Sequence, residues 1–120
     1  MSESNHYHRV LEDLNPQSRV LRQMVPEVYR GFAEMNTAAL ASGALDRKIK
    51  ELIGLAIGVV HRCDGCIASH AKGAARAGAS EQEAAEAIGV SILMQGGPAT
   101  VYGARAYEAF CEFAAATEKV

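Results

Sequence analysis

Apolar residues recur every three or four positions along most of the chain, a spacing typical of α-helices with one buried face. The alternation of apolar and polar residues that marks a half-buried β-strand is absent. Before Met24 the sequence is mixed and charged, and we expect Pro16 to interrupt the short apolar face there. The segment from Pro26 toward Ser42 is predicted to be a helix with proline in its first turn. Its apolar stripe consists of Val28, Phe32, Met35 and Ala39.

The next predicted helix, from Arg47 to His61, is the most apolar part of the chain. Asp46 is suited to cap its N-terminus. A buried β-strand is the competing interpretation of the run 52–60, but its length and its two glycines favour a helix. Because this run is apolar on every side, we expect a central helix. Its predicted buried stripe is Ile49, Leu52, Ile53, Ala56, Ile57 and Val60.

Three further helices are predicted after this one. The first runs from about Cys63 to Ala77, and Gly78 is placed to cap its C-terminus. Ser80 followed by Glu83 forms a capping-box pattern that begins the second. Gly96-Gly97-Pro98 breaks the pattern, and the last helix runs to about Glu118. The residues expected to face inward are Ala84, Ala87, Ile88, Ser91 and Ile92, and then Gly103, Tyr107, Phe110, Cys111 and Ala114.

Composition narrows the class of protein. With 120 residues, 49% of them apolar, we expect one globular domain over 1–120, with 1–24 as an N-terminal helical extension. The formal charge is −2 and no basic stripe occurs, so a nucleic-acid partner is not expected. The longest apolar run, 52–60, is shorter than the roughly 20 residues that span a bilayer, so no membrane is expected either. The polar N-terminus does not resemble a signal peptide, which favours a cytoplasmic location.

Candidate chemistry is concentrated in one motif, Cys63-x-x-Cys66-x-x-x-His70, with Glu51 twelve residues upstream. Positions i, i+3 and i+7 share one face of a helix. Both thiols would lie at the positive end of the helix dipole, which stabilises the reactive thiolate. If the two helices pack antiparallel, Glu51 lies near His70. This pattern predicts a redox site with a proton-handling pair.

The two cysteines are expected to differ. Thioredoxin-type proteins attack with the first cysteine of such a pair. Here Cys66 is nearer to His70 and therefore to a base, so we expect Cys66 to attack peroxide. Cys63 would then convert the sulfenic acid into a disulfide. An external dithiol would reduce that disulfide by exchange.

Other interpretations of these residues have to be weighed. Cys63, Cys66, His70 and Glu51 could bind zinc, but structural zinc prefers a second Cys/His pair, which the chain lacks, so no metal or cofactor is expected. A non-catalytic metal-binding or scaffold protein remains an alternative function. Cys111 is expected in the core. His61 is expected at the surface, and it is a further candidate for a proton relay.

The spacing from Glu51 through Cys63 and Cys66 to His70 resembles the carboxymuconolactone decarboxylase-like family, and most of all its AhpD alkylhydroperoxidase branch. The flanking stretches 45–53, 70–74, 77–80, 96–99 and 102–103 are also similar, so the resemblance covers roughly 26–113. It implies an all-α fold with a central antiparallel helical hairpin. It also implies a homo-oligomer, a trimer or hexamer.

For activity, the resemblance implies a peroxidase-type oxidoreductase that reduces hydroperoxides or passes electrons between thiols. Its substrate would be a hydroperoxide or disulfide, and its reductant a dithiol on a lipoylated or thioredoxin-like protein. Cys66 would be the peroxidatic residue and Cys63 the resolving one, with Glu51 and His70 in the proton relay. AhpD carries a histidine directly before its second cysteine, where this chain has Gly65. His70 or His61 would have to take over that role.

The family's other branch decarboxylates carboxymuconolactone, and this lyase activity is a further alternative. Its typical members lack the paired cysteines, so the pair argues against that activity here. An anionic substrate of that kind would also need an arginine clamp. Arg62 and Arg76 are the candidates.

Overall fold

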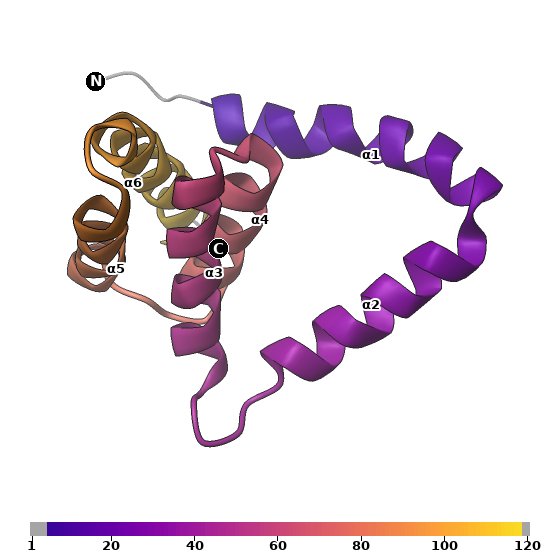
Figure 1. The fold of residues 1–120 in the computed structure, drawn as a ribbon, viewed down its shortest axis with the longest axis horizontal. Coiled ribbons are helices and arrows are strands. Elements are labelled where there is room, and N and C mark those ends of the chain that lie inside the picture. Colours follow the sequence, from indigo (N-terminus) through magenta and orange to yellow (C-terminus); the bar gives the residue numbers. More distant parts are fainter. Residues whose placement is uncertain (1–4, 119–120) are drawn as a thin grey trace.

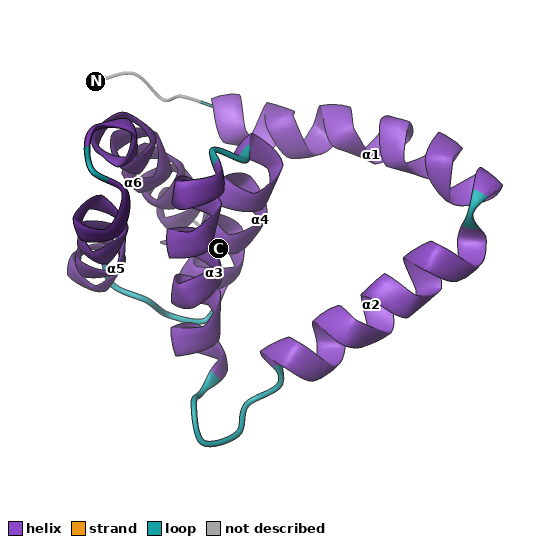
Figure 2. Ribbon diagram, viewed as in Figure 1, coloured by secondary structure: helices purple, strands orange, loops and turns teal. Residues whose placement is uncertain are grey.

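The computed structural model describes residues 5–118, which form six α-helices and no strand (Figure 2). This confirms the predicted all-α class. None of the described helices is long and apolar enough to cross a membrane. The helices are α1 (His6–Met24), α2 (Pro26–Leu40), α3 (Arg47–His61), α4 (Asp64–Arg76), α5 (Glu81–Gln95) and α6 (Gly97–Glu118).

Helices α3 to α6 pack together, while α1 and α2 extend away from them as an arm (Figure 1). The most extensive packing joins α3 to α4. Gly58 lies against Cys66, and Glu51, about two turns earlier, lies beside His70, so the two helices run antiparallel. This is the expected helical hairpin. The core residues are Tyr7, Leu52, Leu55, Val59, Ile67, Ala68, Ala71, Ala74, Ala75, Ala84, Ile88, Ala99, Ala106, Ala109, Phe110 and Phe113.

A tight turn connects the two helices of the hairpin. Arg62 adopts a left-handed conformation, with φ of 54°. The Cys63 N–H donates to the Gly58 carbonyl at 3.1 Å, and the Arg62 N–H donates to the Val59 carbonyl at 3.1 Å. These two bonds satisfy the last carbonyls of α3. They also place Cys63 as the N-cap of α4.

The predicted caps occur where the sequence placed them. The Asp46 carboxylate accepts the Ile49 N–H at 3.0 Å at the start of α3. Ser80 and Glu83 form the expected capping box of α5. Gly78 follows α4 with φ of +90°, a conformation that favours glycine. These local signals explain why the bounds of α3, α4 and α5 agree with the sequence.

The N-terminal arm differs from expectation, because α1 continues through Pro16 as one helix. Proline at this position removes the hydrogen bond to the Glu12 carbonyl, and both residues are exposed, so water can satisfy that carbonyl. The first turn of α1 is anchored to α6. Glu112 accepts the backbone N–H groups of Tyr7 at 3.2 Å and His8 at 2.8 Å, and its carboxylate also pairs with the His8 ring.

Several apolar stripes that we expected to be buried are exposed in the single chain. Helix α2 buries no residue, and Phe32 on it is 61% exposed. The buried side of α3 is formed by Leu52, Leu55 and Val59, because only this side faces the other core helices. The remaining exposed members of the expected stripes are Val28, Met35, Ala39, Ile49, Ile53, Ile57, Ile92 and Tyr107.

Candidate redox site

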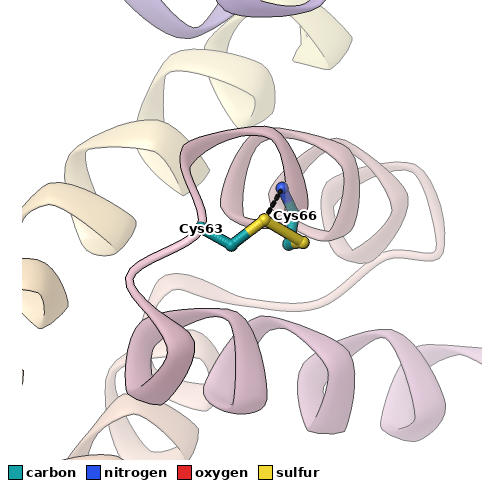
Figure 3. The surroundings of a disulfide bond; sticks show 2 residues. All are labelled: Cys63 and Cys66. Atoms are coloured by element: carbon teal, nitrogen blue, oxygen red, sulfur yellow. Dashed lines mark hydrogen bonds between the residues drawn. A yellow bond between two sulfur atoms is a disulfide. The ribbon is translucent and has the colours of Figure 1, made fainter.

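Cys63 and Cys66 are joined by a disulfide at the N-terminus of α4 (Figure 3). Their Cα atoms are 5.2 Å apart. The Cys63 Sγ accepts the Cys66 backbone N–H at 3.2 Å, so this sulfur caps the helix (Figure 3). Cys66 is exposed and Cys63 is half-buried. Cys66 is therefore the more accessible of the two residues to an external reactant.

His70 and Glu51 form the second part of the site. The His70 Nδ1 lies 2.8 Å from the Glu51 Oε1. The Glu51 side chain is only 4% exposed, whereas that of His70 is 25% exposed. The antiparallel hairpin therefore brings together the pair that the sequence separates by nineteen positions. Cys66 and His70 follow each other at i and i+4 on α4, on the same helical face.

This pairing fixes how His70 handles a proton. A carboxylate beside Nδ1 favours the neutral tautomer in which Nδ1–H donates to Glu51. The Nε2 atom then carries a lone pair and can accept a proton. When Nε2 is protonated, the neighbouring carboxylate stabilises the resulting cation. The pair can therefore take a proton from a thiol and return it to a leaving group.

Arg47 belongs to the same cluster, and the sequence interpretation missed it. Its guanidinium donates to the Glu51 Oε2 through Nη2 at 3.3 Å and through Nε at 3.4 Å. Glu51 is thus held between Arg47 on one oxygen and His70 on the other. The i, i+4 spacing of Arg47 and Glu51 on a predicted helix was the signal that could have found this contact.

Glycines make room for the site between α3 and α4. A Cβ atom on Gly54 would lie 2.7 Å from the His70 Nδ1, and one on Gly73 would overlap the Glu51 carboxylate. A Cβ on Gly58 would lie 3.4 Å from the Cys66 Cβ. Gly54 and Gly58 on α3 therefore face His70 and Cys66 on α4, with the same spacing on both helices.

The other sequence candidates lie apart from this cluster. His61 is exposed in the last turn of α3, and no hydrogen bond within residues 5–118 joins it to Glu51 or His70. At Gly65, an added Cβ would lie 3.6 Å from Leu14 of α1, so α1 covers the position where AhpD carries a histidine. His70 is therefore the histidine that the fold places in contact with Glu51.

Cys111 is a separate, free thiol on α6, and it is half-buried where the sequence predicted a core position. Burial raises its pKa, which keeps it in the less reactive thiol form. Within residues 5–118, no three His, Cys, Asp or Glu side chains are grouped so that they could hold a metal ion. The four residues considered for zinc instead form a disulfide and an ion pair.

The fold and the site together define a class, all-α proteins with a disulfide-forming Cys pair and a His–Glu pair on one helical hairpin. The model of the carboxymuconolactone decarboxylase family matches residues 26–109. The chain therefore belongs to the carboxymuconolactone decarboxylase family. This confirms the resemblance, and the AhpD-like branch is consistent with the Cys pair.

Several proteins are similar to this chain over most of its length. An uncharacterized protein of Cupriavidus necator is 34% identical over 100 residues, which is 83% of this chain and 88% of that protein. A crystal structure of a carboxymuconolactone decarboxylase family protein from Legionella pneumophila, without ligand, is 38% identical with a TM-score of 0.88. The match covers 92% of this chain and 99% of the Legionella pneumophila chain.

A third relative is a carboxymuconolactone decarboxylase family protein from Thermotoga maritima. Its crystal structure has a TM-score of 0.70 and is 28% identical, covering 85% of this chain and 92% of that one. A possible involvement in the antioxidative response has been suggested for that protein.

Proposed function

We propose that this protein is a thiol-dependent hydroperoxide reductase and disulfide oxidoreductase. The observation that carries the proposal is the Cys63–Cys66 disulfide on the same helix as His70, whose ring is paired with buried Glu51. Cys66 would be the peroxidatic residue, Cys63 the resolving residue, and His70 with Glu51 the proton relay. The suggested antioxidative involvement of the Thermotoga maritima relative supports the same chemistry.

The first step consumes the hydroperoxide. The His70 Nε2 takes the proton from the Cys66 thiol, and the thiolate attacks the outer peroxide oxygen. The O–O bond breaks, the sulfur becomes a sulfenic acid, and the alkoxide leaves as an alcohol with the proton from His70. The exposure of Cys66 supports its assignment as the attacking residue.

The second step forms the disulfide. The Cys63 thiolate attacks the Cys66 sulfur, the S–O bond breaks, and the hydroxide leaves as water with the proton released by the Cys63 thiol. The backbone N–H of Cys66 points at the Cys63 sulfur and stabilises negative charge on it. The disulfide that results is the form present in the structure.

The third step returns the protein to the dithiol. An external dithiol attacks the sulfur of the exposed residue Cys66 and expels the Cys63 thiolate, and its second thiol releases the mixed disulfide. Cys63 is the better leaving group, because the Cys66 N–H stabilises its thiolate. A dithiol on a lipoylated or thioredoxin-like protein is the proposed reductant.

Mass analysis and turnover test this proposal. The oxidised protein should alkylate only at Cys111, and the reduced protein at all three cysteines. Mild hydroperoxide should return the reduced protein to one free thiol. Cys66→Ser should abolish hydroperoxide loss in the presence of a dithiol, and His70→Gln should lower it about 100-fold. Cys111→Ser is the matched control and should leave turnover unchanged. Full turnover by Cys66→Ser would refute the assignment.

A lactone decarboxylase is the second candidate function. It is favoured by a cavity that lies beside Glu51 and His70 but is not lined by either cysteine. Decarboxylation would need the acid–base pair and an anion site, but no thiol. The same variants separate the two functions, because lactone turnover should survive replacement of Cys63 and Cys66 by serine.

A further inference from the structure

A cavity of about 510 Å³ lies beside the Glu51–His70 pair, between the arm and the hairpin. Helices α1, α2, α3 and α4 all contribute to its walls. The hairpin of α3 and α4 therefore lines one side of the cavity, and the arm of α1 and α2 lines the other. The lining residues used below are Leu11, Leu40, Arg47, Ser69, Lys72 and Arg76.

Positive charge dominates this cavity. Arg47, Lys72 and Arg76 line it, and of its lining residues in the described chain only Glu51 is a carboxylate. Arg47 is already engaged with Glu51. Within residues 5–118, no carboxylate lies within ion-pair distance of Lys72 or Arg76. Two cations thus face the cavity with their charge unneutralised.

Lys72 and Arg76 also repel each other. They are spaced i and i+4 on α4, and like charges at this spacing destabilise a helix. An anion bound between them would remove this repulsion and form charge-assisted hydrogen bonds. Ser69, one turn earlier, adds a hydroxyl group that can donate to the same ligand. A carboxylate is an anion that this set of donors can bind.

The cations stand at a defined distance from the redox centre. A helix rises 1.5 Å per residue, so Lys72 and Arg76 lie about 9 and 15 Å along α4 from Cys66. His70 stands between them and Cys66. Leu11 and Leu40 add apolar side chains to the wall of the cavity. A ligand that reaches from these two cations to Cys66 must therefore be elongated, with an apolar spacer.

We propose that Lys72 and Arg76 bind the carboxylate of the oxidising substrate, an elongated organic acid that carries a hydroperoxide group at its other end. The inference rests on the proposed function and names the substrate class of the same site. The hydroperoxide is reduced to the alcohol at Cys66, and the carboxylate takes no part in the bond changes. Its binding orients the chain of the substrate along α4.

A matched pair of substrates tests this proposal. One is a long-chain carboxylic acid hydroperoxide, and the other is its methyl ester, which has the same chain and no charge. The wild-type protein should prefer the acid at least tenfold in kcat/KM, through a lower KM. The double variant Lys72→Gln, Arg76→Gln should lose this preference, so that the ratio of the two kcat/KM values falls to about one. The double variant Arg9→Gln, Arg19→Gln removes the same charge from exposed positions of α1 and should keep the preference.

A binding measurement separates this inference from the proposed function. The oxidised protein is titrated with a saturated fatty acid, which cannot react, and heat is recorded by calorimetry. Binding that is lost in the Lys72, Arg76 variant and kept in the Arg9, Arg19 variant supports the cavity, even if no hydroperoxide turns over. Equal turnover of acid and ester by the wild type, with no binding of the fatty acid, would overturn the inference while leaving the peroxidase function intact.

Discussion

Gly54 and Gly73 provide the clearance on which the proton-handling pair depends. Each occupies a helix interior, where glycine is less favourable than alanine by roughly 0.5–1 kcal/mol. A functional group of the other helix occupies the space that a Cβ would need. This group is the His70 ring at Gly54 and the Glu51 carboxylate at Gly73. Glycine lowers the helix propensity at these two positions, but it allows α3 and α4 to approach closely.

Replacing either glycine by alanine should therefore damage the site. Gly54→Ala should displace the His70 ring, and Gly73→Ala should displace the Glu51 carboxylate. We expect a loss of about 1–3 kcal/mol in the free energy of unfolding from overpacking. If the proposed relay operates, turnover should fall about 100-fold. Urea unfolding would measure the loss of stability, and hydroperoxide consumption in the presence of a dithiol would measure the loss of turnover.

Gly89→Ala is the matched control for these substitutions. Gly89 lies in α5, and a Cβ there would meet no atom within 4 Å. The free energy of unfolding should stay the same or rise by about 0.4–1 kcal/mol. If Gly73→Ala behaved like Gly89→Ala in both stability and turnover, the clearance argument would be wrong.

The sequence predicted the Glu51–His70 neighbourhood, because an antiparallel hairpin with a short turn fixes which residues meet. It could not predict the glycine contacts, since these depend on the distance between the helix axes. Arg47 was within reach of the i, i+4 rule and was overlooked.

At the scale of the elements, α1 begins in an unusual way. Asn5, its N-cap, makes no side-chain capping bond. Glu112 of α6 accepts the first N–H groups instead, so one helix caps another. Tyr7 beside it is 2% exposed, and this burial raises its pKa to about 12. These contacts hold the arm, and with it the wall of the cavity.

Removal of the Glu112 carboxylate should loosen α1. Glu112→Ala should lower the free energy of unfolding by about 2–3 kcal/mol, because hydrogen bonds to a charged group are lost. Amide exchange should accelerate in the first turns of α1 before it does so in α3 or α4. Glu108→Ala, an exposed neighbour one turn away on α6, is the control and should have a small effect. Equal protection of α1 in both variants would contradict this role.

Element bounds were predictable where local capping decides them, as at Asp46, Ser80 and Gly78. The continuation of α1 through Pro16 was not, because it depends on the exposure of Pro16 and Glu12 in the folded chain. The same applies to the buried faces. Periodicity locates an apolar stripe on α2, but it does not say whether another helix of the same chain covers it.

For the whole molecule, α2 of the arm and one face of α3 carry apolar side chains that no other part of the chain covers within residues 5–118. Val28, Phe32 and Met35 of α2 are 66%, 61% and 61% exposed. Ile53 and Ile57 of α3 are 45% and 52% exposed. Large apolar side chains exposed in this number on two helices are typical of an interaction surface. We propose that copies of this chain cover these faces, in the trimer or hexamer that the family resemblance implies.

Light scattering after gel filtration would measure this assembly. The wild-type protein should have the mass of a trimer or hexamer. Phe32→Glu should lower the mass, because a charge would be buried at the interface without a partner. Ala115→Glu adds the same charge at an exposed position of α6 and should leave the mass unchanged. A monomeric wild-type protein at high concentration would exclude the assembly.

The turn at Arg62 and Cys63 determines which lengths of this chain can work. Successive residues of a helix are rotated by about 100°, so one residue inserted there would swing α4 around its axis. His70 would leave the face that meets Glu51, and both cysteines would move with it. An insertion in the segment between α2 and α3 would not rotate α4 relative to α3. Insertions and deletions are therefore expected at 41–46 and excluded at 62–63. The length of the short turn sets the rotation of α4 relative to α3, and with it the geometry of the redox centre.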